Sequence, residues 1–119
     1  EIRRIEFNPV TKRIWSYKSK YPLLASVLAT AGNLVFTGDP EGHFFALDGK
    51  TGKKLWSYQT GSGNRGSSIT YSVNGRQYIA TPSGWGSAVA GLFNQLWPES
   101  ANDLRPGSTV LVFALPEGK

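Results

Sequence analysis

Residues 46–56 read Ala46-Leu-Asp48-Gly-Lys-Thr51-Gly52-Lys-Lys-Leu-Trp56, and a worn copy of this stretch occurs earlier in the chain. The later copy continues as Trp56-Ser-Tyr58 and the earlier one as Trp15-Ser-Tyr17, so the two tryptophans are 56 − 15 = 41 residues apart. A period of roughly 40–45 residues built from short strands is the size of one four-stranded propeller blade. The repeat therefore predicts an all-β chain assembled from propeller blades.

The composition fits a folded all-β protein. The 119 residues are 39% hydrophobic and 13% aromatic, which excludes a disordered chain, and 14 glycines with seven prolines indicate many tight turns. The absence of cysteine excludes disulfides and thiolate metal sites. The net charge is +5, but the basic residues follow the repeat turns instead of forming one stripe. We interpret them as solvated turns and strand faces and expect no nucleic-acid partner, with an anionic partner as the alternative.

The sequence has neither Met at position 1 nor a signal peptide, a membrane-spanning run or a lipidation motif. We therefore expect it to start within a longer protein and to contain no membrane span.

The predicted strands fall into three groups. Residues 1–25 form a strand pair that ends a preceding blade, followed by a connector. Residues 26–59 form one complete blade, and residues 60–119 form a final blade of three strands. The expected strands are 2–7, 13–17, 26–30, 34–38, 43–48, 53–59, 68–72, 76–81 and 109–115. The last is mostly apolar, so we expect it to be buried on both faces. Propellers close with at least four blades, so this piece is incomplete and has unpaired edges.

Residues 82–107 break the two-residue period. We expect a long loop there with one short helix near 88–96, and loops of this length in compact domains are usually functional. Trp85 and Trp97 offer flat apolar surface, and small residues between them leave room for a ligand. These small residues are Gly84, Gly86, Ser87, Ala88, Ala90 and Gly91. The alternative is a loop that packs on its own blade.

The repeat residues suit a turn with an aromatic ring against it. Gly52 supplies the positive φ of a tight turn, and Asp48 can accept hydrogen bonds from the amides of that turn. Ala46 must be small if a ring packs on it. Trp56 offers a large apolar ring with one N–H that needs a partner. We expect Trp56 to join adjacent blades, as Trp15 would in the earlier copy; an ordinary core tryptophan is the alternative.

These residues resemble a known family. Ala46, Asp48, Thr51, Gly52 and Trp56 meet in full the tryptophan-docking motif of eight-bladed quinoprotein propellers. Those proteins are the alcohol and methanol dehydrogenases that use pyrroloquinoline quinone (PQQ). The likeness extends over residues 28–42, 59–63, 75–80, 83–86 and 110–116. The resemblance implies part of an eight-bladed β-propeller, with about two four-stranded antiparallel blades after a strand pair.

The resemblance also implies a function. The chain would be the C-terminal part of a periplasmic enzyme that oxidises a primary alcohol to an aldehyde. PQQ would take the hydride equivalent, Ca²⁺ or a lanthanide would polarise the quinone, and electrons would pass to a cytochrome c. In that family the metal ligands and the catalytic base lie in earlier blades. We therefore expect neither in this chain, and we expect the isolated chain to be inactive without the remainder of the propeller, whether that is upstream polypeptide or another chain.

The resemblance assigns four residues to the cofactor side. Trp85 would line the substrate cavity near PQQ, Leu92 would add apolar wall, and Gly86 and Ala88 would allow the backbone to approach the cofactor. His43, the only histidine, has no partners spaced for metal binding or catalysis, so we expect it to be exposed or to cap a turn. The connector at 21–26 departs from many relatives, which leaves the metal and the alcohol open.

Two other interpretations are considered. A non-catalytic propeller segment that scaffolds other proteins explains the repeat equally well, but only the dehydrogenase explains the insertion from Trp85 to Trp97. The second alternative is an excised domain that self-assembles through its open edges.

Overall fold

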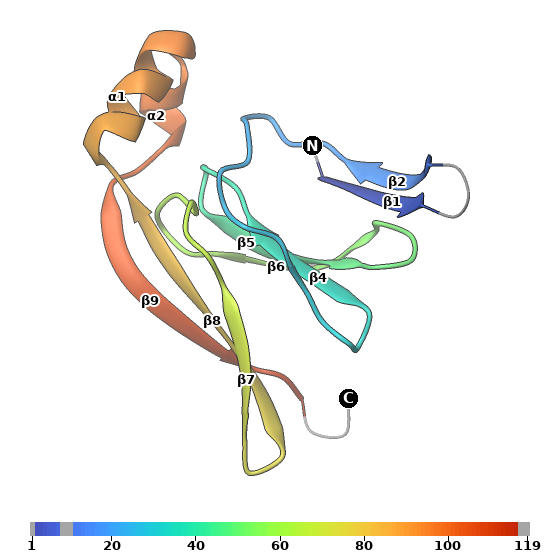
Figure 1. Cartoon of the computed structure of the whole chain (residues 1–119). Helices are drawn as coiled ribbons and strands as arrows, with labels where there is room; N and C mark the ends of the chain where they lie inside the picture. Colours follow the sequence, from blue (N-terminus) through green and yellow to red (C-terminus); the bar gives the residue numbers. More distant parts are fainter. Residues whose placement is uncertain (1, 8–10, 117–119) are drawn as a thin grey trace.

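The structure, a computed structural model, describes residues 2–7 and 11–116, without the side chains of residues 3–7, 11–13, 87–89 and 102. The described part contains nine strands and two helices (Figure 1). The strands are β1 (Ile2–Phe7), β2 (Thr11–Tyr17), β3 (Leu28–Ala29), β4 (Leu34–Gly38), β5 (His43–Asp48), β6 (Lys54–Gln59), β7 (Ile69–Val73), β8 (Arg76–Trp85) and β9 (Gly107–Ala114). The helices are α1 (Ser87–Leu96) and α2 (Ser100–Asp103). The sequence Asn8-Pro-Val-Thr11 predicts a turn between the first two strands, and residues 8–10 of it lie outside the described residues.

The strands form three antiparallel sheets, in the orders β1-β2, β3-β4-β5-β6 and β7-β8-β9. This is the predicted grouping of a strand pair, a complete blade and a three-stranded blade. The described chain is a flat slab with extents of 41 × 41 × 20 Å, as a sector of a wheel would be. The fold class is therefore confirmed as a partial propeller, whereas the blade limits at residues 25 and 59 stay a prediction.

β6, at the edge of the middle sheet, is exposed, whereas the neighbouring strand β5 is buried on both faces. Its four central residues alternate between two apolar clusters, because successive side chains of a strand point to opposite faces. Phe44 and Ala46 pack with Phe36 and Ile79, toward the third sheet. Phe45 and Leu47 pack with Ile2 and the half-buried Trp15, toward the first sheet. Residues 44–47 are therefore all apolar because this strand packs between the first and the third sheet.

The expectation that the last strand is buried on both faces is wrong. β9 lies at the edge of its sheet, and Val110 is 72% exposed and Val112 55% exposed. Its apolar sequence suits burial, but among the described residues no element covers that face. An apolar run indicates that a strand can be buried, and only its neighbours decide whether it is.

The expectation of a loop from residue 82 is also wrong. β8 continues to Trp85, and its pairing with β9 runs through Pro82↔Val110 to Trp85↔Gly107. Proline hides this extension from sequence inspection, since it lacks the N–H that a central strand uses. β7 pairs with β8 only as far as Ala80. Beyond that residue β8 pairs with β9 alone, so Pro82 lies where one side of the strand has no partner strand. The expected helix is present as α1, and the four-residue α2 was not predicted.

Candidate functional site: a helical cap over Trp85

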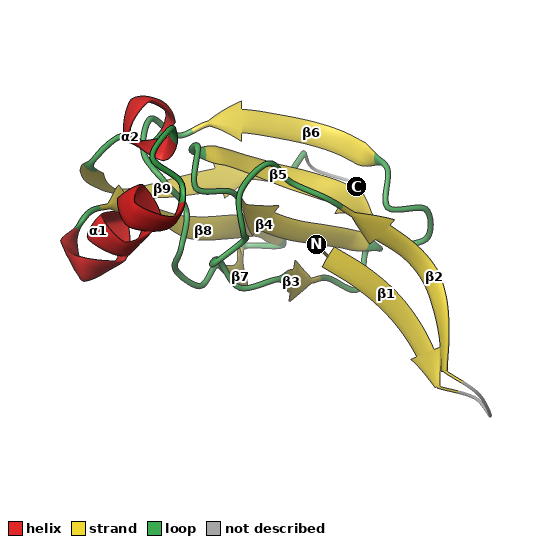
Figure 2. Cartoon of the chain, turned by 90° about the horizontal axis from the view of Figure 1, so that it is seen from above, coloured by secondary structure: helices red, strands yellow, loops and turns green. Residues whose placement is uncertain are grey.

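Helices α1 and α2 lie together beyond the ends of β8 and β9, at one end of the sheets (Figures 1 and 2). We call residues 86–106 the cap. Gly86 turns the chain from β8 into α1 with φ 154° and ψ −160°, a conformation essentially restricted to glycine. The change of direction at Gly86 therefore places the start of α1 directly after Trp85.

Trp85 is 6% exposed and lies between the cap and the connector that follows β6. The ring of Phe93, from α1, meets the indole edge to face, with centroids 5.0 Å apart at 90°. On the connector, a Cβ added at Gly63 would lie 2.4 Å from Cε3 of the indole, so only glycine fits there. The Gly84 amide also donates a 2.8 Å hydrogen bond to the Gly63 carbonyl. Together these contacts fix the position of the indole.

The cap also covers the connector between the first two sheets. Tyr21 of that connector forms an apolar cluster with Trp85, Phe93 and Leu104. The Tyr21 hydroxyl donates a 2.6 Å hydrogen bond to Oδ2 of Asp103, and Lys20 Nζ donates one of 2.7 Å to the same oxygen. The pKa of the Asp103 carboxyl is lowered, first by the Lys20 bond and then by the Tyr21 bond. The bonds to Asp103 are also the main cause that raises the pKa of Lys20 and of Tyr21.

A groove of about 370 Å³ runs along β8 and β9 beside the cap. Its lining includes Trp85 and the glycines on either side of it in sequence, Gly84 and Gly86, together with Arg65 and Gly107. The groove therefore offers glycine backbone that a ligand can approach closely, while the indole of Trp85 is buried against Phe93 and Gly63 beside it.

The structure brings only some of the predicted cofactor-side residues to this groove. Trp85 and Gly86 line it. Leu92 lies on α1, is 54% exposed and is not part of the lining. Ala88 lies in the first turn of α1, and its side chain is outside the described part of the chain. Gly63 and Asp103 were missed, since no spacing in the sequence links either residue to the cap.

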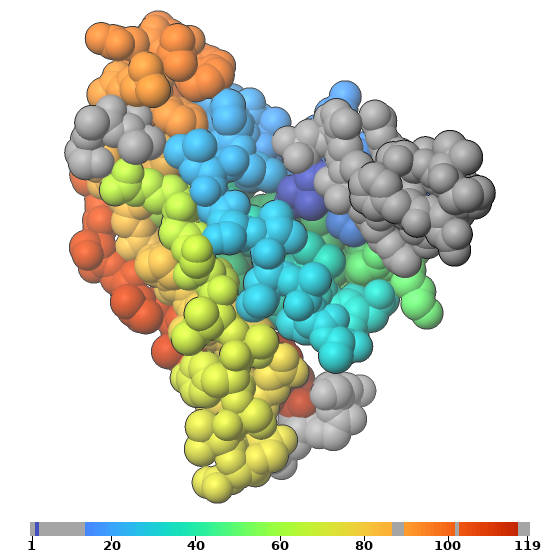
Figure 3. Space-filling model, in the orientation of Figure 1, coloured from blue at the N-terminus to red at the C-terminus, as the bar shows by residue number. Residues whose placement is uncertain are grey.

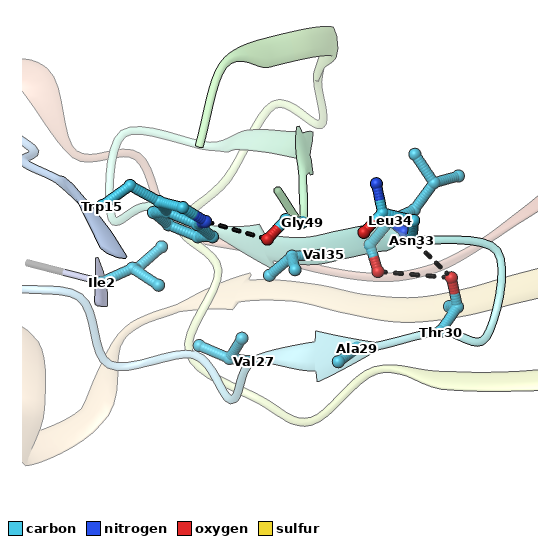
Figure 4. Close-up of a pocket in the computed structure, with 9 residues that line it drawn as sticks. All are labelled: Ile2, Trp15, Val27, Ala29, Thr30, Asn33, Leu34, Val35 and Gly49. Atoms are coloured by element: carbon cyan, nitrogen blue, oxygen red, sulfur yellow. Dashed lines mark hydrogen bonds between the residues drawn. The ribbon is translucent and has the colours of Figure 1, made fainter. Parts of the chain in front are cut away.

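The docking motif forms a tight turn after β5. Gly52 has φ +76°, and Asp48 Oδ1 accepts hydrogen bonds from the amides of Lys50 and Thr51 at 2.7 and 3.3 Å. Trp15 from β2 lies against this turn (Figure 4). Its Nε1 donates a 2.9 Å hydrogen bond to the Gly49 carbonyl, and a Cβ at Gly52 would lie 2.6 Å from its ring. The turn of one sheet thus receives the tryptophan of the preceding sheet.

Trp56 pairs with Ala46 across β5 and β6, and its ring lies between the second and third sheets. It meets Phe113 of β9 edge to face, with centroids 5.1 Å apart at 78°, and it is 39% exposed. Its Nε1 has no hydrogen-bond partner among the residues that the structure describes. It also lines an apolar groove of about 480 Å³ between these sheets.

His43 lies at the start of β5, and its Nδ1 is 3.1 Å from Oδ2 of Asp39. Within residues 2–7 and 11–116, no group of three or more His, Cys, Asp or Glu side chains is placed to hold a metal ion. No helix among the described residues is long and apolar enough to cross a membrane.

Comparison with known proteins identifies the family. Residues 3–79 match the model of the glucose/ethanol/alcohol dehydrogenase β-propeller domain. The chain is 44% identical over 111 residues to quinoprotein alcohol dehydrogenase PedH of Pseudomonas putida and 47% identical over 114 residues to quinoprotein ethanol dehydrogenase of Pseudomonas aeruginosa. Each alignment covers 92% of this chain and 18% of the relative. The chain thus spans about a fifth of the length of these relatives.

Solved structures agree. A europium-containing methanol dehydrogenase matches 87% of this chain with a TM-score of 0.74 and 34% identity, over 21% of its own length. The quinohemoprotein alcohol dehydrogenase of Comamonas testosteroni matches 87% of this chain with a TM-score of 0.69 and 33% identity, over 15% of its own length. The resemblance to a C-terminal portion of such enzymes is therefore confirmed. The chain belongs to the family of PQQ-dependent quinoprotein alcohol dehydrogenases, as one part of their β-propeller domain.

Proposed function

We propose that the protein carrying this chain oxidises primary alcohols to aldehydes with PQQ, and that this chain supplies blades and one wall of the cofactor cavity. The observation that carries the proposal is the groove beside the cap, where Trp85 meets the glycine backbone of Gly84 and Gly86. Relatives named for ethanol and 1-butanol support the substrate class. No observation favours the scaffold function, since the relatives that match 92% of the chain are named as dehydrogenases.

The residues of the groove fit a planar, anionic cofactor. Gly84 and Gly86 allow close backbone approach, the indole of Trp85 packed on Phe93 and Gly63 holds this stretch rigid, and Arg65 carries a charge opposite to that of a carboxylate. When bound, PQQ supplies the acceptor for the hydride equivalent of the alcohol, with a Ca²⁺ or lanthanide ion as Lewis acid. The chain's own part is to hold the indole rigidly and to exclude water from one side of the cavity.

The remaining roles are part of the same proposal. Gly86 and Ala88 would lie near the cofactor, and Leu92, exposed on α1, would face substrate where another part of the propeller closes over the helix. The motif residues Ala46, Asp48, Thr51 and Gly52 would receive one tryptophan and present another. We further propose a periplasmic location and a cytochrome c acceptor; two relatives carry cytochrome c in their names.

The experiment uses the complete protein loaded with PQQ and either Ca²⁺ or a lanthanide, with ethanol and 1-butanol as substrates and a redox dye as acceptor. Dye-linked turnover is expected, whereas the isolated chain should give none. Trp85→Phe should change the preference between the alcohols or speed the loss of PQQ, while Leu96→Ala, an exposed variant on α1, should change neither. Absence of PQQ-dependent turnover, or unchanged kinetics in Trp85→Phe, would contradict the proposal.

A further inference from the structure

A single carboxylate joins the cap to a distant part of the chain. Asp103, at the end of α2, accepts hydrogen bonds at one oxygen from Tyr21 and Lys20, which precede it by 82 and 83 residues. Both donors belong to the connector between β2 and β3. In the space-filling view, this connector (blue) lies directly against the cap (orange) (Figure 3).

The connection continues from the carboxylate to Trp85 through two rings. The Tyr21 hydroxyl is fixed by Asp103, and its ring meets Phe93 with centroids 6.5 Å apart at 60°. Phe93 in turn meets the indole of Trp85 at 5.0 Å. All three rings are buried, with Tyr21 2% exposed. In a close-packed interior a shift of one ring displaces the next, because few voids exist to absorb it.

The two bonds to Asp103 differ in importance. Lys20 is more than half exposed, so its ion pair is screened by water and contributes little. Tyr21 is buried, so without Asp103 its hydroxyl would lose its partner, and a buried polar group without a partner is unfavourable. The other connector, which follows β6, makes a neutral side-chain contact with the cap: Ser62 Oγ donates a 2.7 Å hydrogen bond to the Arg105 carbonyl.

We propose that Asp103 is a positioning residue that, through Tyr21 and Phe93, holds the cap over Trp85 and so sets the shape of the groove. The last step, that this groove receives PQQ, rests on the function proposed above. The first step, that Asp103 holds the cap, does not, so the two are tested separately.

The first test measures hydrogen exchange in the complete protein without PQQ. Asp103→Ala should speed exchange of the α1 and α2 amides about tenfold, the factor expected for one charge-assisted hydrogen bond, and leave β4 and β5 unchanged. Tyr21→Phe keeps the ring and removes only the hydroxyl, so it should give a similar increase even if Asp103→Ala does not fold. Lys20→Met is the matched control and should change exchange less than twofold. Cap exchange within twofold of wild type in both Asp103→Ala and Tyr21→Phe would overturn the proposal.

The second test measures the release of PQQ and the kinetics of the loaded enzyme. Asp103→Ala should speed PQQ release or raise KM for the alcohol about tenfold, with kcat changed less than threefold, because Asp103 is not among the residues that line the groove. Asp103→Asn, which can still accept the Tyr21 hydrogen bond, should keep PQQ release and KM close to the wild-type values. If the wild type binds no PQQ, the proposed function fails while the exchange result stands. If wild type binds PQQ and Asp103→Ala changes neither release nor KM, the positioning role is wrong.

Discussion

Two tryptophans from copies of one repeat lie at two seams of this molecule, and they are held differently. At the seam between the first and second sheets, Trp15 donates its N–H to Gly49 and lies flat against Gly52. At the seam between the second and third sheets, Trp56 is 39% exposed and rests on Phe113, without a hydrogen bond among the described residues.

The difference shows that the repeat has two halves. One half is the tryptophan at the end of a blade, and the other is the glycine turn that follows the third strand of the next blade. Trp15 packs against such a turn at residues 48–52, whereas no such turn follows β9 among the described residues. The spacing of a tryptophan therefore predicts which seam it occupies, and the neighbouring sheet determines how firmly it is bound.

The largest expected effect is at Gly52, where alanine would break the first seam. Its φ of +76° is strained for alanine, and the added Cβ would lie 2.6 Å from Cε3 of Trp15. We expect local unfolding of the β1–β2 sheet to become easier by about 3 kcal/mol, measured by hydrogen exchange in the complete protein. Gly75→Ala is the matched control: φ is +79° there but the Cβ meets open space, so about 1 kcal/mol is expected. Equal losses would contradict the docking of Trp15.

Replacing each tryptophan by alanine compares the seams directly. Trp15→Ala removes a packed ring and a hydrogen bond, so the free energy of local unfolding at its seam should fall by about 3 kcal/mol. Trp56→Ala removes a partly exposed ring and should lower it by about 1–2 kcal/mol. Hydrogen exchange in β2 and β6 provides the measurement. If Trp56→Ala lowers the free energy of local unfolding as much as Trp15→Ala does, the conclusion that Trp56 is held less firmly is wrong.

The smallest effect concerns pH and the turn that receives Trp15. The pKa of Asp48 is lowered from 3.8, chiefly because the Lys50 amide donates a hydrogen bond to its carboxylate. A lowered pKa means that the carboxylate stabilises the fold above pH 3.8 and that this contribution is lost as the pH falls through the folded value. Protection of the turn amides, corrected for intrinsic exchange, should therefore weaken in wild type on acidification. Asp48→Asn, whose side chain does not titrate, should lack that dependence; identical pH profiles would refute the role.

The sequence predicts the sheets well, because alternation and turn residues are local signals. Gly52 indicates a positive φ, and the apolar run 44–47 indicates a buried strand. Val110 and Val112 mislead for the opposite reason, since their burial depends on a neighbour that no local pattern specifies. The bond between Tyr21 and Asp103 spans 82 residues and follows from how the cap folds back, so no spacing rule finds it.

The most direct test of the central claim is a crystal structure of the complete protein with PQQ bound. The account predicts that Trp85, held between Gly63 and Phe93, lies in van der Waals contact with the cofactor, in a cavity that earlier blades complete. A structure in which PQQ binds elsewhere, with Trp85 enclosed only by its own blade and cap, would contradict it.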